Sequence, residues 1–368
     1  MFIVVTISIL AFLLTFFESK GTLKGGMKWG FILVTILGAL HYNYGNDYPA
    51  YQTIYKTIEN QPFNWGDILS GYTYKEPGWA LLCYLFKPLC GFFTMVAVLN
   101  IFQNYAIYKI IKSYVQKEWW TLAVAIYLFN TSFYLLSFSM MRQELVMCIF
   151  FAIWPLIEQK KAIKAALILI FCSLIHTSSL ILIPFAFIGY LPARNGKSLA
   201  LIFVVAFILV WVGKGLVGSI LNSILAYESF SEYGYNYFEN GNKVTFGLGY
   251  MLSLIPFVLS IVYFWKTPDR LSASNRRLVI ISIFSFIITP FAQFAALITR
   301  VAMYFNIYSI LAYPLIYSNL RNKAVRQIML ILYLYFMVYS YFQFFQSDVY
   351  QEYYATYRTI IPEVLLGS

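Results

Sequence analysis

The sequence predicts an all-α, polytopic integral membrane protein with about twelve transmembrane helices. Of its 368 residues, 61% are hydrophobic and only 11% are charged, and the mean hydropathy is +0.70. A soluble core cannot bury that much apolar surface. Runs of roughly 15 to 25 mainly apolar residues recur from Phe2 to Phe345, and most are long enough to cross about 30 Å of hydrocarbon as helices. We therefore expect a single transmembrane domain over residues 1–368.

The first apolar run, from Phe2 to Phe17, has no basic residue before it and no small-residue cleavage site after it. This pattern is typical of a membrane anchor that stays in the mature protein. Two later segments are short and adjacent, which predicts a tight helical hairpin. The expected segments are 2–17, 29–42, 91–112, 119–138, 143–157, 165–176, 177–191, 198–222, 247–265, 278–298, 301–319 and 327–345.

The basic residues predict the orientation of these segments. Eighteen of the 26 Lys and Arg lie in alternate short loops, where only four of the 15 acidic residues lie. The positive-inside rule makes those loops cytoplasmic. Both termini then face outward, and the net charge of +11 reflects topology rather than nucleic-acid binding.

Three long parts of the chain are then external: residues 43–90, 223–246 and 346–368. We expect short amphipathic helices in them, with a re-entrant or interfacial helix in the first. The cytoplasmic loops are all too short for a nucleotide-binding domain. We therefore expect any chemistry to occur at the outer face.

Cysteine and histidine do not indicate a metal site or a bound cofactor, and we expect neither. The four cysteines lie in apolar stretches without metal-ligand spacing, and only Cys83 and Cys90 could pair. With His41 and His176 as its two histidines, the chain cannot form a histidine-rich metal site.

The first external stretch has the highest density of polar functional groups. Gly45 and Asn46 permit a tight turn, which leaves Asp47 near the membrane surface. Three tyrosines then recur at helical spacing. They are Tyr48, Tyr51 and Tyr55.

Later in the same stretch, Glu76 precedes Pro77. Proline at the first helical position would put this carboxylate at a helix N-terminus. From the residues alone, the stretch is explained equally well without a functional role. An Asx-turn at Asp47, a helix cap at Glu76 and interfacial tyrosines would suffice.

Three arginines lie apart from the other basic residues, at the outer ends of apolar segments or just beyond them: Arg142, Arg300 and Arg358. Three cations on one face predict a site for an anion. Arg142 and Arg300 each separate two apolar segments with almost no loop, which would hold the guanidinium near headgroup depth. A snorkelling side chain is the alternative for each, and we expect Glu144 to balance the charge of Arg142.

His176 lies at the outer turn of the expected hairpin, where Thr177, Ser178 and Ser179 follow it. It could act there as a base, as a hydrogen-bond donor to an anion, or as a hydrogen-bonded residue at a helix end. Tyrosines in the external loop and tail could contact a sugar or lie in the membrane interface. The candidate sugar contacts among them are Tyr233, Tyr235 and Tyr357.

Taken together, these motifs resemble the EpsG-type family, which is grouped with the Wzy-type polymerases of bacterial exopolysaccharide, capsule and O-antigen. The resemblance runs from residue 1 to residue 345, and its motifs are short. In order, they are Gly45-Asn46-Asp47-Tyr48 with Tyr51 and Tyr55, Glu76-Pro77-Gly78-Trp79, Met141-Arg142-Gln143, His176-Thr177-Ser178-Ser179, and Arg300 with Tyr304.

The resemblance implies a membrane glycosyltransferase that joins oligosaccharide repeat units carried on undecaprenyl diphosphate, at the outer face of the bacterial cytoplasmic membrane. It implies a growing glycan as second substrate, membrane lipid around the chain, and a chain-length regulator and a flippase as partners. The arginines would stabilise the diphosphate as it leaves, and Asp47, Glu76 or His176 would assist the attacking hydroxyl. The expected substrate contacts within the motifs are Tyr48, Tyr51, Gln143 and Tyr304.

Two alternatives remain open from the sequence. One is another enzyme at the same face, either an oligosaccharide ligase or a membrane O-acyltransferase that uses His176. The other is a lipid-linked oligosaccharide flippase or transporter, which should place ionisable groups in mid-membrane and often shows repeated halves. This chain places most of its charges at segment ends and shows no internal repeat.

Overall fold

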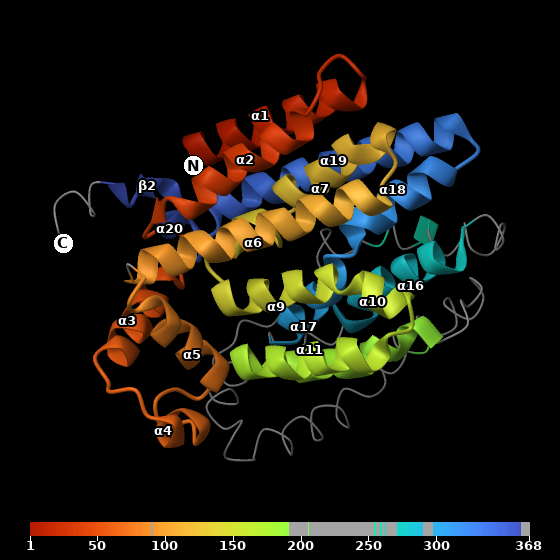
Figure 1. Cartoon of the computed structure of the whole chain (residues 1–368). Coiled ribbons are helices and arrows are strands. Elements are labelled where there is room, and N and C mark those ends of the chain that lie inside the picture. The colour runs from red at the N-terminus through yellow and green to blue at the C-terminus, as the bar shows by residue number, and fades with distance from the viewer. Residues whose placement is uncertain are drawn as a thin grey trace. The chain divides into compact units, whose positions relative to one another are not determined.

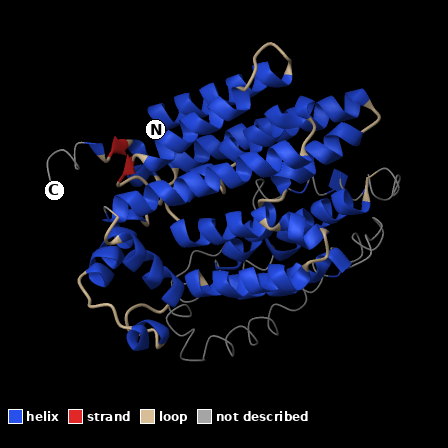
Figure 2. Ribbon diagram, viewed as in Figure 1, coloured by secondary structure: helices blue, strands red, loops and turns tan. Residues whose placement is uncertain are grey.

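The computed structural model describes residues 1–89, 91–190, 271–289 and 297–361, with a few isolated positions between 205 and 262. The chain divides into unit 1, which comprises Met1–Tyr190 and Met337–Ser368, and unit 2, which comprises Leu191–Phe336. Helices make up nearly all of the described regular structure, in agreement with the predicted class (Figure 1). The exception is a pair of two-residue strands, β1 (His41–Tyr42) and β2 (Arg358–Thr359), drawn in red in Figure 2.

Unit 1 begins with a helical hairpin of α1 (Phe2–Ser19) and α2 (Gly26–Ala39), which correspond to the first two expected segments. The Glu18 carboxylate accepts hydrogen bonds from the backbone N–H groups of Gly25 (3.1 Å) and Met27 (2.7 Å) and so caps the start of α2. The two helices approach closely, because a Cβ atom at Gly30 would lie 2.8 Å from the Ala11 carbonyl oxygen.

The next layer of unit 1 contains α6 (Gly91–Tyr114) and α7 (Trp120–Phe129). The buried side-chain amide of Asn104 on α6 is hydrogen-bonded within the unit, because its Oδ1 accepts from the Tyr127 hydroxyl of α7 over 2.9 Å. The expected segment 119–138 is divided, because the chain turns at Asn130, whose side chain accepts from the Ser132 N–H (3.1 Å). It resumes as the short helix α8 (Tyr134–Ser137).

Four further elements complete the helical part of unit 1: α9 (Met141–Ala152), α10 (Trp154–Glu158), α11 (Ala162–Ile175) and the 3₁₀ helix η2 (Thr177–Tyr190). The expected segment 143–157 is divided at Ile153, just before Pro155, which cannot donate a backbone hydrogen bond. α11 and η2 form the expected tight hairpin, with His176 at its turn.

Within the expected external stretch 43–90, the described residues 43–89 form three short helices, α3 (Tyr48–Glu59), α4 (Trp65–Leu69) and α5 (Pro77–Phe86). The predicted tyrosine face of α3 is confirmed, because Tyr48, Tyr51 and Tyr55 are all buried. They share one hydrophobic cluster with Trp79 and Phe92. This cluster attaches the short helices to the start of α6.

The C-terminal residues return to unit 1 beside the N-terminus. β2 pairs antiparallel with β1, and the short helix α20 (Gln351–Ala355) precedes it. The hydroxyl of the buried Tyr354 donates to the Leu135 carbonyl oxygen over 3.0 Å. The ammonium group of Met1 donates to the Ala355 carbonyl oxygen over 2.6 Å. The tail therefore packs on the same end of unit 1 as residues 41–47.

The described part of unit 2 contains α16 (Ala273–Ile288), α17 (Leu297–Asn306), α18 (Ser309–Asn319) and the start of α19 (Lys323–Gln346). The expected boundary between residues 298 and 301 is wrong, because α17 continues through Arg300. The bend of 50° falls after Asn306 instead. The expected segments 198–222 and 247–265, and the external loop 223–246 between them, lie outside the described residues.

Among the described residues, α1 and α19 are each long and apolar enough to cross a membrane. Up to four spans result if α5 with α6 and α17 with α18 each count as one bent span. The expected number of about twelve is therefore not confirmed. Two of the expected segments lie almost entirely outside the described residues, and others are short helices or are divided by turns and prolines.

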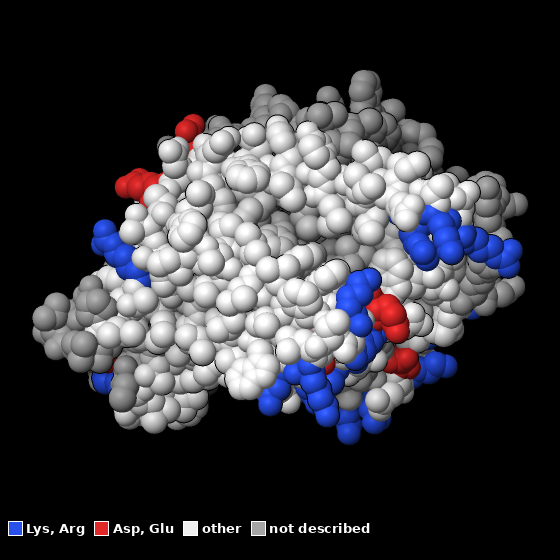
Figure 3. Space-filling model, turned by 90° about the horizontal axis from the view of Figure 1, so that it is seen from above, with Lys and Arg blue, Asp and Glu red and all other residues white. Residues whose placement is uncertain are grey.

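The lysine-bearing turns of unit 1 share one end of it, called here the lysine end. The Ser19 and Thr121 hydroxyls are 2.8 Å apart, and the Tyr114 hydroxyl donates to the Glu158 carboxylate over 2.6 Å, so these turns adjoin. Figure 3 shows Lys and Arg side chains gathered at one end of the face that it displays. Residues 41–90 lie at the other end of these helices, called here the distal end. The lysines concerned are Lys20, Lys24, Lys28, Lys109, Lys112, Lys117, Lys160, Lys161 and Lys164.

Candidate functional site

Glu76 is the centre of an ionic cluster at the distal end of unit 1. As expected, Pro77 begins α5 and places Glu76 at the N-cap position. The side chain makes no capping hydrogen bond, however, so the interpretation as a helix cap is wrong. Although its side chain is only 1% exposed, the carboxylate points away from its own helix and toward α9 and α11.

Both carboxylate oxygens of Glu76 are engaged. Oε2 pairs with Nη1 of Arg142, the second residue of α9. Oε1 accepts hydrogen bonds from Nδ1 of His176 (3.1 Å) and from the backbone N–H of Thr177 (3.0 Å), at the turn between α11 and η2. Three segments far apart in the sequence thus converge on one buried carboxylate.

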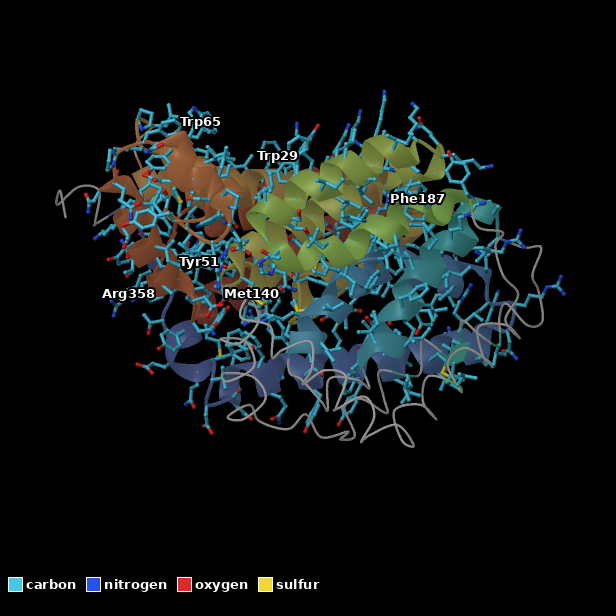
Figure 4. The ribbon with its side chains drawn as sticks, turned by 90° about the horizontal axis from the view of Figure 1, so that it is seen from below. Trp29, Tyr51, Trp65, Met140, Phe187 and Arg358 are labelled. Atoms are coloured by element: carbon cyan, nitrogen blue, oxygen red, sulfur yellow. The ribbon has the colours of Figure 1, made fainter. Side chains whose placement is uncertain are left out.

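The Arg142 guanidinium also lies against two tyrosine rings. Its Nη1 donates to the Tyr74 hydroxyl over 2.6 Å, and its Nε donates weakly to the Tyr51 hydroxyl over 3.4 Å. The guanidinium carbon lies 5.3 Å from the centre of each ring, within cation–π range. Figure 4 labels Tyr51 on α3 and Met140, which precedes α9, and Tyr51 shares a buried cluster with Met141. With 16% of its side chain exposed, Arg142 is held in place but still accessible.

The expected pairing of Arg142 with Glu144 is wrong. Two residues along an α-helix correspond to a rotation of about 200°, so the two side chains leave α9 on opposite sides. Glu144 is buried inside unit 1, where Cys148 Sγ lies 3.6 Å from Oε1. The partner of Arg142 is Glu76, which is 66 residues away in sequence.

The cluster keeps Glu76 ionised. Burial by itself would raise the pKa of this carboxyl group. The hydrogen bond from His176, the charge of Arg142 and the hydrogen bond from the Thr177 N–H oppose that effect and hold the pKa below its ordinary value. A carboxylate with both oxygens accepting is a weak base, so Glu76 in this arrangement orients its donors rather than accepting a proton.

The same hydrogen bonds select a tautomer for His176. An ionised carboxylate can only accept, so Nδ1 of His176 must carry the proton that it shares with Glu76. Nε2 of the neutral ring is then an acceptor. The side chain is 14% exposed, at the turn that ends α11. A carboxylate that orients a histidine in this way is a recurring arrangement for a general base.

Asp47 lies on a neighbouring turn of the distal end. Gly45 has a φ of +116°, and a Cβ atom there would lie 2.5 Å from the Phe138 carbonyl oxygen, so only glycine fits. Ser139 joins the two segments: its hydroxyl donates to the Asn46 side chain (2.6 Å) and accepts from the Asp47 N–H (3.1 Å). Asp47 is half-buried and makes no side-chain capping hydrogen bond to α3, so the predicted Asx-turn is absent.

Of the predicted site residues, the structure brings Glu76, Arg142, His176 and Tyr51 together. Asp47 lies on the turn before α3, where its N–H donates to Ser139 on the segment that leads into Arg142. Tyr48 and Gln143 are buried beside these elements. Tyr357 donates its hydroxyl to the Leu37 carbonyl oxygen over 2.7 Å, and Arg358 is exposed on β2. Arg300, half-buried, and Tyr304, buried one turn later, belong to α17 of unit 2. Tyr233 and Tyr235 lie outside the described residues.

Sequence reasoning missed Tyr74 and Ser139 as members of this region. Tyr74 is two residues before Glu76, and this closeness in sequence could have indicated that its hydroxyl lies near the same site. Nothing in the sequence around Ser139 distinguishes it from other serines at segment ends. Within the residues that the structure describes, no three His, Cys, Asp or Glu side chains lie close enough to hold a metal ion. The cations of the cluster suit an anionic ligand instead.

Comparison with known proteins gives one match. A family model described as the EpsG family matches residues 29–359. The match covers most of the chain and includes the predicted site residues on both units. Comparisons with curated proteins and with solved structures gave no match.

Proposed function

We propose that this chain, which belongs to the EpsG family of Wzy-like polysaccharide polymerases, joins oligosaccharide repeat units carried on undecaprenyl diphosphate. We place the reaction at the outer face of the bacterial cytoplasmic membrane, at the distal end of unit 1. The observation that carries the proposal is the cluster of Glu76, Arg142 and His176. It combines a cation for a diphosphate with an oriented base for a sugar hydroxyl.

In this proposal, Arg142 binds the diphosphate of the donor. The bond between the anomeric carbon and the diphosphate oxygen breaks, and negative charge develops on the leaving group. A guanidinium aimed at that oxygen stabilises the transition state more than the ground state. Tyr51 and Tyr74 hold the guanidinium in position before the donor arrives.

The donor diphosphate must compete with Glu76 for Arg142. A dianion on the exposed side of the guanidinium draws it away from Oε2, while Oε1 keeps its hydrogen bonds from His176 and Thr177. The negative charge on Glu76 is then balanced chiefly by His176. Donor binding thereby increases the basicity of Nε2 at the moment when a base is needed.

His176 accepts the proton of the attacking sugar hydroxyl in this mechanism. The acceptor oxygen bonds to the anomeric carbon, its proton passes to Nε2, and undecaprenyl diphosphate leaves with the bonding electrons. Asp47 assists on the acceptor side. Arg358 supplies further positive charge to the diphosphate at this end, and the same role for Arg300, on α17 of unit 2, stays a prediction from the sequence. Tyr357, partly exposed at this end, contacts the sugars, and the buried Tyr48 and Tyr51 support the site from beneath.

The test is a reaction of the purified full-length protein with a lipid-linked repeat unit. A ladder of products spaced by one repeat unit supports the polymerase. A single transfer to a different acceptor indicates a ligase, and movement of the substrate across a vesicle membrane without chemistry indicates a flippase. Either of the last two outcomes overturns the proposal.

Two variants separate the candidate bases. His176→Gln keeps an N–H donor for Glu76 but cannot accept a proton, so we expect polymerisation to fall by about 10²- to 10⁴-fold. Asp47→Asn preserves the shape of the turn and should cost less. If Asp47→Asn loses activity while His176→Gln keeps it, the base is Asp47. If both variants polymerise normally, the acid–base part of the mechanism is wrong.

A further inference from the structure

An open groove runs along α6 toward the lysine end of unit 1, away from the Glu76 cluster. It has a volume of about 620 Å³ and lies between α6 and the junction of α9 with α10. Ala152 and Pro155 form its second wall. These two side chains are small, and they lie where α9 ends at Ala152 and α10 begins, which leaves space beside α6.

The lining of the groove changes along its length. Phe102 and Ala106 make the half nearer the middle of α6 apolar, whereas Lys109 and Ser113 lie toward its C-terminal end, with Ile110 as an apolar wall beside them. The rise of an α-helix from residue 102 to residue 113 is about 16 Å, roughly half of the 30 Å hydrocarbon thickness. The groove therefore has the depth of one leaflet, with its polar groups at the lysine end.

The charge in and around the groove favours an anionic group at this end. Lys109 is exposed, and its ammonium group lies 5.9 Å from the centre of the Tyr105 ring. The Glu158 carboxylate accepts a hydrogen bond from the hydroxyl of Tyr114, which lines the groove, over 2.6 Å. Lys112 lies on the same helix but outside the groove, where its ammonium group donates to the Tyr108 hydroxyl over 3.1 Å.

We propose that this groove binds an anionic phospholipid. One acyl chain lies against Phe102, Ala106 and Ile110, and the phosphate meets Lys109 and the Ser113 hydroxyl. A zwitterionic lipid gains less, because its own ammonium group opposes Lys109. This site is independent of the polymerase proposal, because it shares no residue with the Glu76 cluster.

The test compares lipid binding to the full-length protein in mild detergent, by native mass spectrometry with phosphatidylglycerol or phosphatidylcholine. Wild-type protein should prefer phosphatidylglycerol. Lys109→Ala should reduce that preference by about fivefold, which corresponds to roughly 1 kcal/mol for one lysine at an anionic surface. Lys112→Ala is the matched control, since it removes the same charge three residues away and outside the groove, and it should keep the preference.

Three outcomes would overturn the proposal. The first is an unchanged preference in Lys109→Ala, and the second is an equal loss in both variants, which would indicate general surface charge. The third is binding of undecaprenyl phosphate to the groove with no binding of phosphatidylglycerol, which would assign the groove to the lipid of the substrate. Ala106→Trp, which fills the groove, should reduce binding of phosphatidylglycerol in a variant that keeps the wild-type melting temperature.

Discussion

The arginine at the start of α9 allows the sharpest test of the proposed site. Arg142→Lys keeps one positive charge near Glu76 but removes the planar fork of N–H donors. The lysine ammonium cannot pair with Glu76 and also reach both tyrosine hydroxyls that Arg142 contacts, at 2.6 Å for Tyr74 and 3.4 Å for Tyr51. It also cannot present two parallel N–H groups to a diphosphate. One charge-assisted hydrogen bond lost in the transition state is worth about 1.5–3 kcal/mol, so we expect a rate loss of about 10- to 150-fold.

The measurement is the initial rate of polymer formation from a lipid-linked repeat unit, with ladder length read on a gel. Arg321→Lys is the matched control, because it makes the same substitution at an exposed position between α18 and α19. A melting temperature close to that of the wild type would separate lost chemistry from lost folding. Wild-type rates for Arg142→Lys at normal membrane levels would refute the diphosphate role of Arg142.

Four further predictions concern the stability of the Glu76 cluster, its dependence on pH, the turn at Gly45 and the orientation of the chain. Glu76→Gln replaces one acceptor oxygen with an NH₂ group, which must face either Arg142 or the Thr177 N–H. The free energy of unfolding, measured by thermal denaturation, should fall by about 3 kcal/mol, the lower end of the range for a broken buried pair. The pKa of Glu76 is lowered in the folded chain, so the ionised carboxylate stabilises the fold above the unfolded pKa of about 4.3. This stabilisation is lost as the pH falls through the lower pKa of the folded state. The melting temperature of the wild type should therefore approach that of Glu76→Gln as the pH is lowered. Gly45→Ala should impair polymerisation because its Cβ would meet Phe138, whereas Gly21→Ala, at a φ of +80° with nothing within 4 Å, carries similar backbone strain and should keep activity. A cysteine introduced at Asn60 should react with an impermeant reagent added outside intact cells and one at Lys24 should not; the reverse pattern would invert the proposed orientation.

Local sequence was sufficient wherever one short-range rule decides the structure. Proline at position 77 fixes the start of α5 and so places Glu76 at a helix end. The spacing of Tyr48, Tyr51 and Tyr55 puts all three on one buried face of α3. Where several weak effects compete, as at Asn130 and Ile153, the sequence predicted continuous segments and the structure has breaks.

By itself, the sequence determined the class of the protein, because 61% hydrophobic residues cannot be buried in a soluble core. It also placed Asp47, Glu76 and His176 at helix ends, since prolines and turns act over a few residues. Tertiary structure alone decided that the Glu76 carboxylate meets Arg142 and His176, 66 and 100 residues away. The physical reason is that a buried carboxylate must find donors wherever packing brings them. Helical phase excludes the nearest acid in the sequence, Glu144, because it projects from the opposite side of α9.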